Sequence, residues 1–273
     1  MRARTLALLL LHAPLAQAQS RSELENQLID RRLLGSWQSE RVRPFAATML
    51  DTGYLYVRPR AMIGYGRPFD RWVGVEGSPL VQSQGAAAYA GVRVEIPHFD
   101  LRVGGRYFYS FQRSYVRPDT RYDRFELDST ALTTSRTLTL EAEANAHVPL
   151  GPGVLLALGS LSYVGNVPKG AYVYEETLRV MVAPPWVIRF RAGYMFNIGK
   201  RSNLRVGPAV DVLGVPERHS HVVRVGVLMR VLLSRSFELR GTFVPTVYSQ
   251  DRLGLLESDF TELGLRWRWA TGP

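Results

Sequence analysis

Residues 99–116, FDLRVGGRYFYSFQRSYV, alternate between apolar and polar side chains almost without interruption. One face of this extended segment carries Phe99, Leu101, Val103, Tyr107, Tyr109 and Phe111, and the other carries Asp100, Arg102, Arg106, Ser110 and Gln112. Successive side chains of a β-strand point to opposite faces, so the pattern predicts a strand that separates two different environments. Residues 137–150 repeat it, with leucines, alanines and a valine opposite threonines, glutamates, an asparagine and a histidine.

The same two-residue period returns along the chain and predicts an up-and-down array of antiparallel strands. The predicted strands are 52–65, 86–97, 99–116, 137–150, 153–165, 172–183, 186–199, 203–214, 220–234, 237–249 and 261–270. Short turns fit at 151–153, 184–185, 199–202 and 234–236, and surface loops at 66–85, 118–135 and 250–260. Because single-chain bacterial barrels have even strand numbers, a twelfth strand is expected at 69–76 or 122–128. Ten strands is the alternative.

The N-terminus has the layout of a cleavable secretory signal peptide. Arg2 and Arg4 precede an apolar run and the small-residue motif Ala16-Gln17-Ala18, which predicts cleavage after residue 18. Its removal lowers the formal net charge from +10 by two positive charges. We expect a signal peptide at 1–18, an N-terminal arm at 19–51, one barrel domain at 52–270 and a tail at 271–273. The chain has no cysteine, so disulfides and thiolate metal sites are excluded.

A short amphipathic helix is expected within the N-terminal arm. Ser22 and Glu25 have the spacing of a capping box, Leu24 and Leu28 follow at helical spacing, and Gly35 is a stop signal. The helix is interpreted either as a plug or periplasmic contact, or as a loosely held arm.

The predicted strands match the thickness of a bilayer. Ten residues separate Trp186 from Phe196, which corresponds to about 33 Å of strand and, at a tilt near 40°, to about 25 Å along the membrane normal. The candidate aromatic girdle facing lipid comprises Phe99, Tyr107, Tyr109, Trp186, Phe196, Trp267 and Trp269. A soluble exported small-ligand-binding barrel, with its apolar face turned inward, is the alternative.

The C-terminal segment adds a resemblance. Leu263, Leu265, Trp267 and Trp269 alternate with Glu262, Gly264, Arg266 and Arg268, which resembles the C-terminal assembly signal of bacterial outer-membrane β-barrel proteins. The resemblance implies an outer-membrane location, contact with membrane lipid and recognition of the last strand by the outer-membrane assembly machinery. The chain departs from the family pattern because residues 270–273 follow the final aromatic residue.

The opposite faces of the strands define a candidate lumen rich in arginine. Its fourteen arginines are Arg58, Arg60, Arg93, Arg102, Arg106, Arg179, Arg189, Arg191, Arg205, Arg224, Arg230, Arg240, Arg266 and Arg268. Eight acidic residues oppose them: Glu95, Asp100, Glu141, Glu143, Glu175, Asp211, Glu238 and Glu262. This surplus suggests a passive pore for small anionic solutes. The alternative is an envelope structural barrel filled by an ion-pair network, in which Arg102 and Arg106 pair with Glu141 and Glu143 across strands.

Other classes of function have weaker support in the sequence. The arginines are spread over many strands instead of clustering, so nucleic-acid binding is not expected. An outer-membrane lipid hydrolase would need a nucleophile, a base and an orienting group; His147 and the His219-Ser220-His221 run do not supply this set. We therefore expect no enzymatic activity, no catalytic residues, no metal ligands and no cofactor. An adhesion barrel that uses the Tyr- and Arg-rich segment 115–124 is a further possibility.

Overall fold

The computed structural model describes residues 42–53, 56–129, 134–199, 203–234, 236–260 and 264–271. The wall strands are β1 (Arg43–Gly53), β2 (Tyr56–Arg67), β3 (Arg71–Gln82), β4 (Gly85–Ile96), β5 (Phe99–Ser114), β6 (Thr134–Leu150), β7 (Gly153–Gly165), β10 (Trp186–Ile198), β11 (Leu204–Val215), β12 (Ser220–Leu232), β13 (Phe237–Phe243), β14 (Thr246–Tyr248) and β15 (Gly264–Ala270). The connections hold α2 (Arg124–Ser129), β8 (Val173–Glu175), β9 (Val180–Val182), η2 (Pro216–Arg218) and η3 (Gly254–Leu256).

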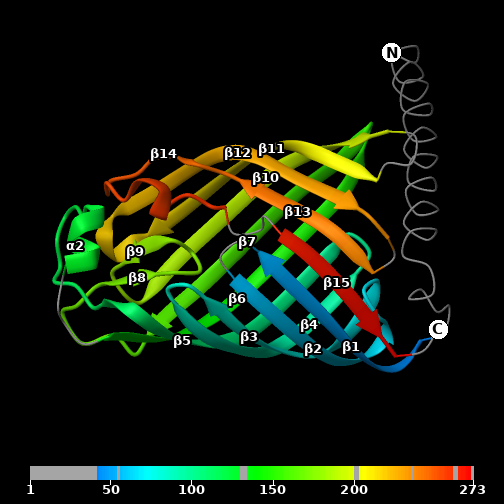
Figure 1. The fold of residues 1–273 in the computed structure, drawn as a ribbon, viewed down its shortest axis with the longest axis horizontal. Helices are drawn as coiled ribbons and strands as arrows, with labels where there is room; N and C mark the ends of the chain where they lie inside the picture. Colours follow the sequence, from blue (N-terminus) through cyan, green and yellow to red (C-terminus); the bar gives the residue numbers. More distant parts are fainter. Residues whose placement is uncertain are drawn as a thin grey trace, which may run out of the picture.

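The strands close into a single barrel (Figure 1). From β1 to β12 each wall strand pairs antiparallel with the next wall strand, with β7 beside β10 and β11 beside β12. The barrel closes because β12 pairs with β13, β13 with β15, and β15 with β1, from Ala47 opposite Ala270 to Gly53 opposite Gly264. Strands β13 and β14 both pair with β12 and are separated only by Val244 and Pro245, so they form one wall strand in two parts. The prediction of a closed up-and-down antiparallel barrel of 12 strands is confirmed.

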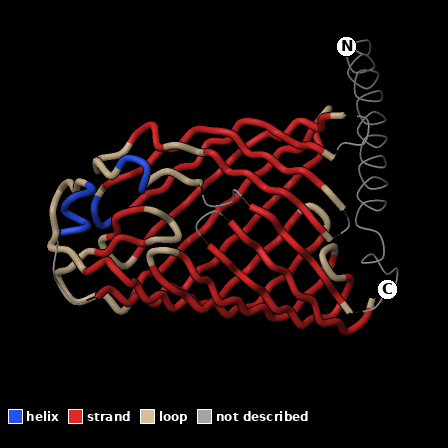
Figure 2. Tube along the Cα trace, viewed as in Figure 1, coloured by secondary structure: helices blue, strands red, loops and turns tan. Residues whose placement is uncertain are grey.

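The two ends of the barrel differ. Short connections join β2 to β3, β4 to β5, β6 to β7, β10 to β11 and β12 to β13 at one end, which we call the short-turn end. Gly151, in the turn between β6 and β7, adopts a φ of +55°, which favours glycine. Three long connections, 115–133, 166–185 and 249–263, lie at the opposite, long-loop end, as the tube in Figure 2 shows for their described parts.

Two of the predicted strands were wrong in location, whereas one of the two segments proposed for the twelfth strand lies in a strand. Residues 172–183 do not span the wall, because β8 and β9 pair only with each other. The run Val180–Val182 continues with Ala183, and four consecutive apolar side chains do not fit one strand with a single apolar face. Of the two segments proposed for the twelfth strand, 69–76 overlaps β3, which extends further into the predicted loop 66–85, whereas 122–128 contains the helix α2. The predicted strand 237–249 is broken into β13 and β14.

The barrel begins earlier than the predicted boundary at residue 52. Strand β1 starts at Arg43, inside the predicted N-terminal arm. The prediction missed this strand because its alternation is reversed. Its buried side chains are the apolar Phe45, Ala47 and Met49, which pack inside the barrel with Met62, Trp72 and Ala270. The predicted signal peptide and the predicted N-terminal helix lie outside the described residues; the helix that the described chain contains, α2, lies in a long loop.

The apolar side chains of the strands form an exposed band around the barrel. Leu101, Ile188 and Leu265 are 36%, 51% and 37% exposed, whereas their neighbours Arg102, Arg189 and Arg266 have side chains that are 20%, 12% and 14% exposed. A face of exposed leucine, valine and aromatic side chains around a closed barrel is the arrangement of a transmembrane barrel, whose outer face meets hydrocarbon. Among the described residues, no helix is both long enough and apolar enough to cross a bilayer.

A charge placed in this band is expected to disrupt the barrel in lipid. Val103 in β5 is 46% exposed and lies opposite Val92 and Ala142 on the neighbouring strands. We expect Val103→Arg to lower the free energy of unfolding in lipid vesicles by roughly 2–4 kcal/mol, measured by denaturant titration. The control is Phe125→Arg on α2, an 81% exposed side chain in a loop, for which little change is expected. An equal loss for both variants would argue against a lipid-facing band.

Candidate functional site

The charged side chains of the barrel gather on the inner wall, which is the strand face opposite the exposed apolar band. Among the described residues, four groups have a central carboxylate, by which we name them: Asp51, Glu238, Asp211 and Glu141. In a fifth group the ratio is reversed, because Arg93 contacts the carboxylates of Glu76, Glu95 and Asp100. Alternation on the strands explains their direction, because a residue next to an exposed apolar side chain points to the barrel axis.

In the Asp51 group, one carboxylate accepts hydrogen bonds from three guanidinium groups. Arg58 and Arg60 of β2 donate from 3.1 and 2.9 Å, and Arg266 of β15 donates from the other side. Asp51 is 2% exposed, so these arginines replace its lost hydration. Three positive charges on one carboxylate leave this part of the wall electropositive.

The Glu238 group repeats the same ratio near the short-turn end. Glu238 of β13 is 1% exposed, and Arg230 and Arg240 contact its carboxylate at 2.9 and 3.0 Å. Arg268 of β15 donates to the same carboxylate. Strand β15 therefore places Arg266 beside Asp51 and Arg268 beside Glu238.

The Asp211 group is the most enclosed. The fully buried carboxylate of Asp211 accepts two hydrogen bonds from Arg189, at 2.8 and 2.9 Å, one from Arg191 at 2.9 Å and one from Arg224 at 3.1 Å. Asp259, from the long connection before β15, also accepts from Arg189 and Arg191. This group joins strands β10, β11 and β12 to a loop.

The Glu141 group unites four residues that the sequence proposed as cross-strand partners. Arg102 lies opposite Glu143 in the pairing of β5 with β6, and their charged atoms are 2.9 Å apart. Arg106 contacts Glu141 at 2.8 Å and also Glu175, which enters from the connection between β7 and β10, at 3.1 Å. The structure thus brings Arg102, Arg106, Glu141 and Glu143 together.

The other candidate residues take separate places. Arg205 is buried on β11, and Arg179 lies in the 166–185 connection instead of on a wall strand. Of the proposed aromatic girdle, six side chains are 37–46% exposed: Phe99, Tyr107, Tyr109, Trp186, Phe196 and Trp269. Trp267 is half-buried, opposite Leu50 and Phe237 on its two neighbouring strands.

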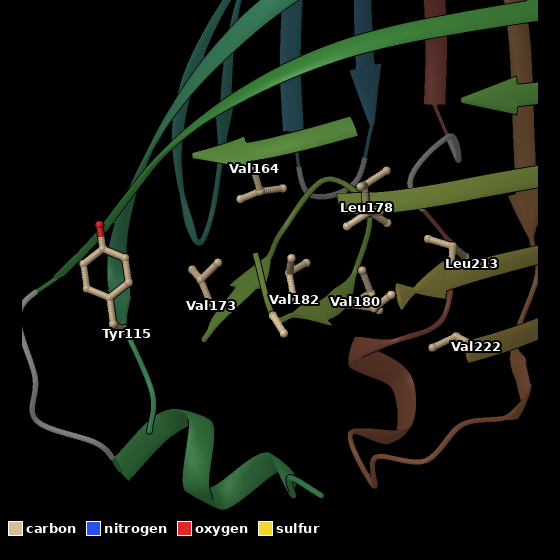
Figure 3. Close-up of a cluster of buried hydrophobic side chains, with 11 residues drawn as sticks. Tyr115, Val164, Val173, Leu178, Val180, Val182, Leu213 and Val222 are labelled. Carbon is tan, nitrogen blue, oxygen red and sulfur yellow. The ribbon is translucent and has the colours of Figure 1, made fainter. Parts of the chain in front are cut away.

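The connection between β7 and β10 folds inward as a hairpin, which we call the inner hairpin (β8, β9 and the residues between them). One side of it, Val173, Leu178, Val180 and Val182, packs against apolar side chains of the inner wall near the long-loop end. Figure 3 shows Val164, Leu213 and Val222 of the wall around it. Val173, Val180 and Val182 are at most 1% exposed, and burial of each contributes roughly 1.5–3 kcal/mol.

Polar contacts fix the inner hairpin to the charged wall. The Nη2 atom of Arg224 donates hydrogen bonds to the backbone oxygens of Leu178 and Arg179, each at 2.9 Å. Glu175 accepts from Arg106 on β5 and from the backbone N–H of Leu178 within its own turn. Glu176 pairs with Arg113. The inner hairpin therefore adds carboxylates to a wall that has a surplus of arginine.

Two further loops cover the inner hairpin. Tyr174 and Met181 on its other side pack with Val116, Tyr122, Leu127 and Leu253. Tyr174 donates from its hydroxyl to the backbone oxygen of Leu256 at 2.6 Å, and Arg218 holds Asp251 at 2.7 Å. The inner hairpin lies between the wall and these loops, so it narrows the barrel at the long-loop end (Figures 1 and 2).

A cavity of about 50 Å³ remains between the inner hairpin and strands β2–β6. Arg58, Arg60, Arg102 and Arg106 line it together with Glu76 and Glu141. Tyr89 and Thr177 contribute hydroxyl groups.

Several residues of this interior were missed at the sequence level. Asp51 lies in β1, which was predicted as part of the N-terminal arm, Glu76 lies at the end of one of the two segments proposed for the twelfth strand, and Glu176 and Asp259 lie in connections. A signal for the inner hairpin did exist: near the long-loop end, Val187, Leu213 and Val222 are apolar although they lie on the inner face. Apolar residues on both faces of neighbouring strands indicate a second covering layer inside the barrel.

His98, His147 and His221 each contact another aromatic ring. His98 and His147 contact each other edge to face at the short-turn end, with ring centroids 5.5 Å apart. His221 stacks on Tyr248 at 4.8 Å. In the part of the chain that the structure describes, no three His, Asp or Glu side chains are arranged to hold a metal ion.

No family model matches the chain, and no curated protein matches it. Among solved structures it is similar to the NanC porin (7% identity, covering 83% of this chain and 97% of that chain, TM-score 0.37). It is also similar to an OmpT outer-membrane protein of Vibrio cholerae lacking loop L8 (7% identity, 84% and 99%, TM-score 0.34). A third match is the beta domain of the Bordetella autotransporter BrkA (12% identity, 84% and 97%, TM-score 0.34). Its own strand pairing and its exposed apolar band make this chain a closed β-barrel with the architecture of outer-membrane barrels.

Proposed function

We propose that the protein is a passive outer-membrane pore for small anionic solutes, narrowed by the inner hairpin. The observation that carries the proposal is the excess of positive charge in two inner-wall groups: Asp51 and Glu238 each hold three arginines. A channel with fixed positive charge and low-dielectric walls raises the local concentration of anions and excludes cations. The proposal contains no catalytic step and needs no cofactor.

The location follows from the same architecture. An exposed apolar band with aromatic side chains requires lipid around the barrel, and export with insertion by the outer-membrane assembly machinery would place it there. Short turns face the periplasm in outer-membrane barrels, so the inner hairpin and α2 are assigned to the outer side.

Current recordings in planar bilayers test the pore. With purified protein and a potassium chloride gradient, we expect a small conductance whose reversal potential shows preference for chloride over potassium. Arg58→Gln combined with Arg60→Gln removes two positive charges from the Asp51 group and should shift the reversal potential toward zero. A pore that prefers potassium would contradict the proposal.

A structural barrel without conductance is the second candidate. It is favoured by the ion-pair groups, which tie neighbouring strands together, and by the apolar cluster of Phe45, Met49 and Trp72 inside the barrel. The absence of current both in the native chain and after removal of the inner hairpin would favour this candidate.

Acid pH is expected to stabilise the docked inner hairpin. Burial raises the pKa of Glu176 from 4.5 to about 7. The guanidinium groups of Arg113 and Arg179 lower this pKa and the nearby Glu175 raises it, but burial is the largest effect. A carboxyl whose pKa is higher in the docked state than in solvent takes up a proton on docking, so docking gains free energy as the pH falls from 7 toward 4.5. The docking equilibrium should change by at most about tenfold per pH unit.

The measurement is the conductance at pH 8 and at pH 5, which should be lower at pH 5. Burial also raises the pKa of Glu257, in the loop before β15, to about 7, with the same direction of effect. Glu176→Gln together with Glu257→Gln mimics the protonated forms and should give the low value at both pH values. A conductance that rises on acidification would contradict the expected sign.

A further inference from the structure

We infer that the cavity between the inner hairpin and strands β2–β6 is a binding site for a tetrahedral oxyanion of the phosphate or sulfate class. The inference rests on the proposed pore for the route by which the ligand enters, and it names the class of anion that the interior selects.

The first argument is the charge of the lining. Four guanidinium groups, Arg58, Arg60, Arg102 and Arg106, face this small space together with two carboxylates, Glu76 and Glu141. Glu141 is held by Arg106 and Arg102, and Glu76 contacts Arg93 at 3.4 Å. Arg58 and Arg60 have to share Asp51 with Arg266. Because Arg102 and Arg106 also pair with Glu143 and Glu175, the unbalanced positive charge of the lining lies with Arg58 and Arg60.

The second argument is a set of buried donors without a protein partner. The hydroxyl groups of Tyr89 and Thr177 and the Nε–H groups of all four lining arginines are buried and make no hydrogen bond to protein. The Nε–H groups of other inner-wall arginines, among them Arg191, Arg224 and Arg230, lack a partner as well, so the two hydroxyl groups are the donors particular to this cavity. Buried polar groups are almost always satisfied, so these hydroxyl groups indicate an absent partner that accepts hydrogen bonds. Water would satisfy the donors but would leave the excess positive charge of Arg58 and Arg60 uncompensated.

The third argument is that the cavity is built from rigid parts. The Tyr89 side chain lies across the neighbouring strands over Gly91 and Gly104, where a Cβ atom would overlap its hydroxyl group. Thr177 belongs to the inner hairpin, and the nearby hairpin residues Glu175 and Leu178 contact the wall strands. Donors from β2, β4, β5 and the hairpin converge on the cavity.

The number and arrangement of the donors select the chemical class. A carboxylate offers two oxygens in one plane, whereas phosphate and sulfate offer four oxygens in tetrahedral directions, which suits donors from several sides. A space of about 50 Å³ accommodates one small anion and excludes a large solute. The site is therefore assigned to a free oxyanion or to the oxyanion group of a small solute.

Equilibrium binding to the full-length protein in detergent tests the site without requiring current. Calorimetric titration with inorganic phosphate, sulfate and acetate at fixed ionic strength should show saturable binding of phosphate or sulfate and much weaker binding of acetate. Arg60→Gln should weaken binding at least about tenfold, and Tyr89→Phe and Thr177→Val about threefold to tenfold. Arg230→Gln, an inner-wall arginine outside the cavity, is the control and should bind normally.

The outcomes separate this inference from the pore proposal. Tyr89→Phe and Thr177→Val retain size and net charge, so native heat-modifiable gel mobility together with weakened binding supports the site. Absence of saturable binding overturns it, and so does tighter binding of acetate or an equal loss in Arg230→Gln. If the native chain conducts chloride selectively but does not bind phosphate or sulfate, the site is wrong and the pore stands.

Discussion

Removal of the inner hairpin is expected to raise the single-channel conductance several-fold. Replacing residues 168–183 with a short Gly-Ser linker is geometrically simple, because Tyr163 and Trp186 are already paired on β7 and β10. The deletion removes Val173, Val180 and Val182 from the long-loop end of the barrel, where they now fill space against the inner wall. It also removes Glu175 and Glu176 together with Lys169 and Arg179, so the net charge is unchanged and the preference for anions should be retained.

The measurement is current through single inserted barrels at fixed voltage, with the reversal potential recorded in the same gradient. Lys169→Ser is the matched control, because Lys169 is an exposed cation in the same connection that lies outside the hairpin strands. Its conductance should equal that of the native chain. A deletion variant that folds but conducts no better than the native chain would show that the hairpin does not limit flow.

Loss of the Asp211 carboxylate is expected to be the most destabilising single change on the inner wall. Asp211→Asn keeps the size of the side chain but removes the charge that Arg189, Arg191 and Arg224 share. Only Asp259 would then compensate Arg189 and Arg191 in this group. Breaking a buried ion pair on one side typically costs about 3–5 kcal/mol, because the remaining charges stay buried.

Denaturant unfolding in lipid vesicles measures this loss. The control is Asp70→Asn in the turn between β2 and β3, where the carboxylate lies 3.9 Å from Arg67 and both side chains are about one-third exposed. A surface pair of this kind contributes roughly 0–1 kcal/mol. A loss for Asp211→Asn no larger than that of the control would mean that Asp211 is not a structural centre.

The closed barrel could be predicted because ten wall strands carry their apolar side chains on one face. In β5, Leu101 and Tyr107 are exposed and Arg106 is buried, which is the direction that alternation and the choice of lipid as outer solvent predicted. The bounds of β7 and β10 are close to the predicted bounds, since aromatic residues and turns mark their ends.

The strand β1 was missed because it does not follow that rule. Its buried side chains Phe45, Ala47 and Met49 are apolar while Thr48 and Thr52 face outward, so the face rule gives the wrong answer for this strand. The strand β3 was predicted only in part, as one of two candidates at 69–76. Gly74, Gly77 and Pro79 dilute its alternation and are typical of turns.

Of the charged residues inside the barrel, the sequence predicted most of those on the wall strands but not the positions of those that come from the loops. Strand periodicity places Arg102 and Glu143 on one face, and antiparallel register makes them neighbours. The position of Asp259 and Glu175 inside the barrel depends on loops that fold back, and loop paths are not periodic. This is why the sequence predicts the four arginines of the cavity as inner-wall residues but does not predict that Thr177 of the inner hairpin lines the same cavity.

The seam between β1 and β15 has a consequence for how the nascent chain reaches its final state. The internal apolar cluster takes Phe45 and Met49 from the first wall strand, Trp72 from the third and Ala270 from the last. Two open edges must therefore persist until β15 (Gly264–Ala270) is available, because the free edges of β1 and β13 pair with this strand. Closure of the barrel then removes both unpaired edges and completes the internal apolar cluster in one step, so a chain that lacks β15 should remain sensitive to proteases.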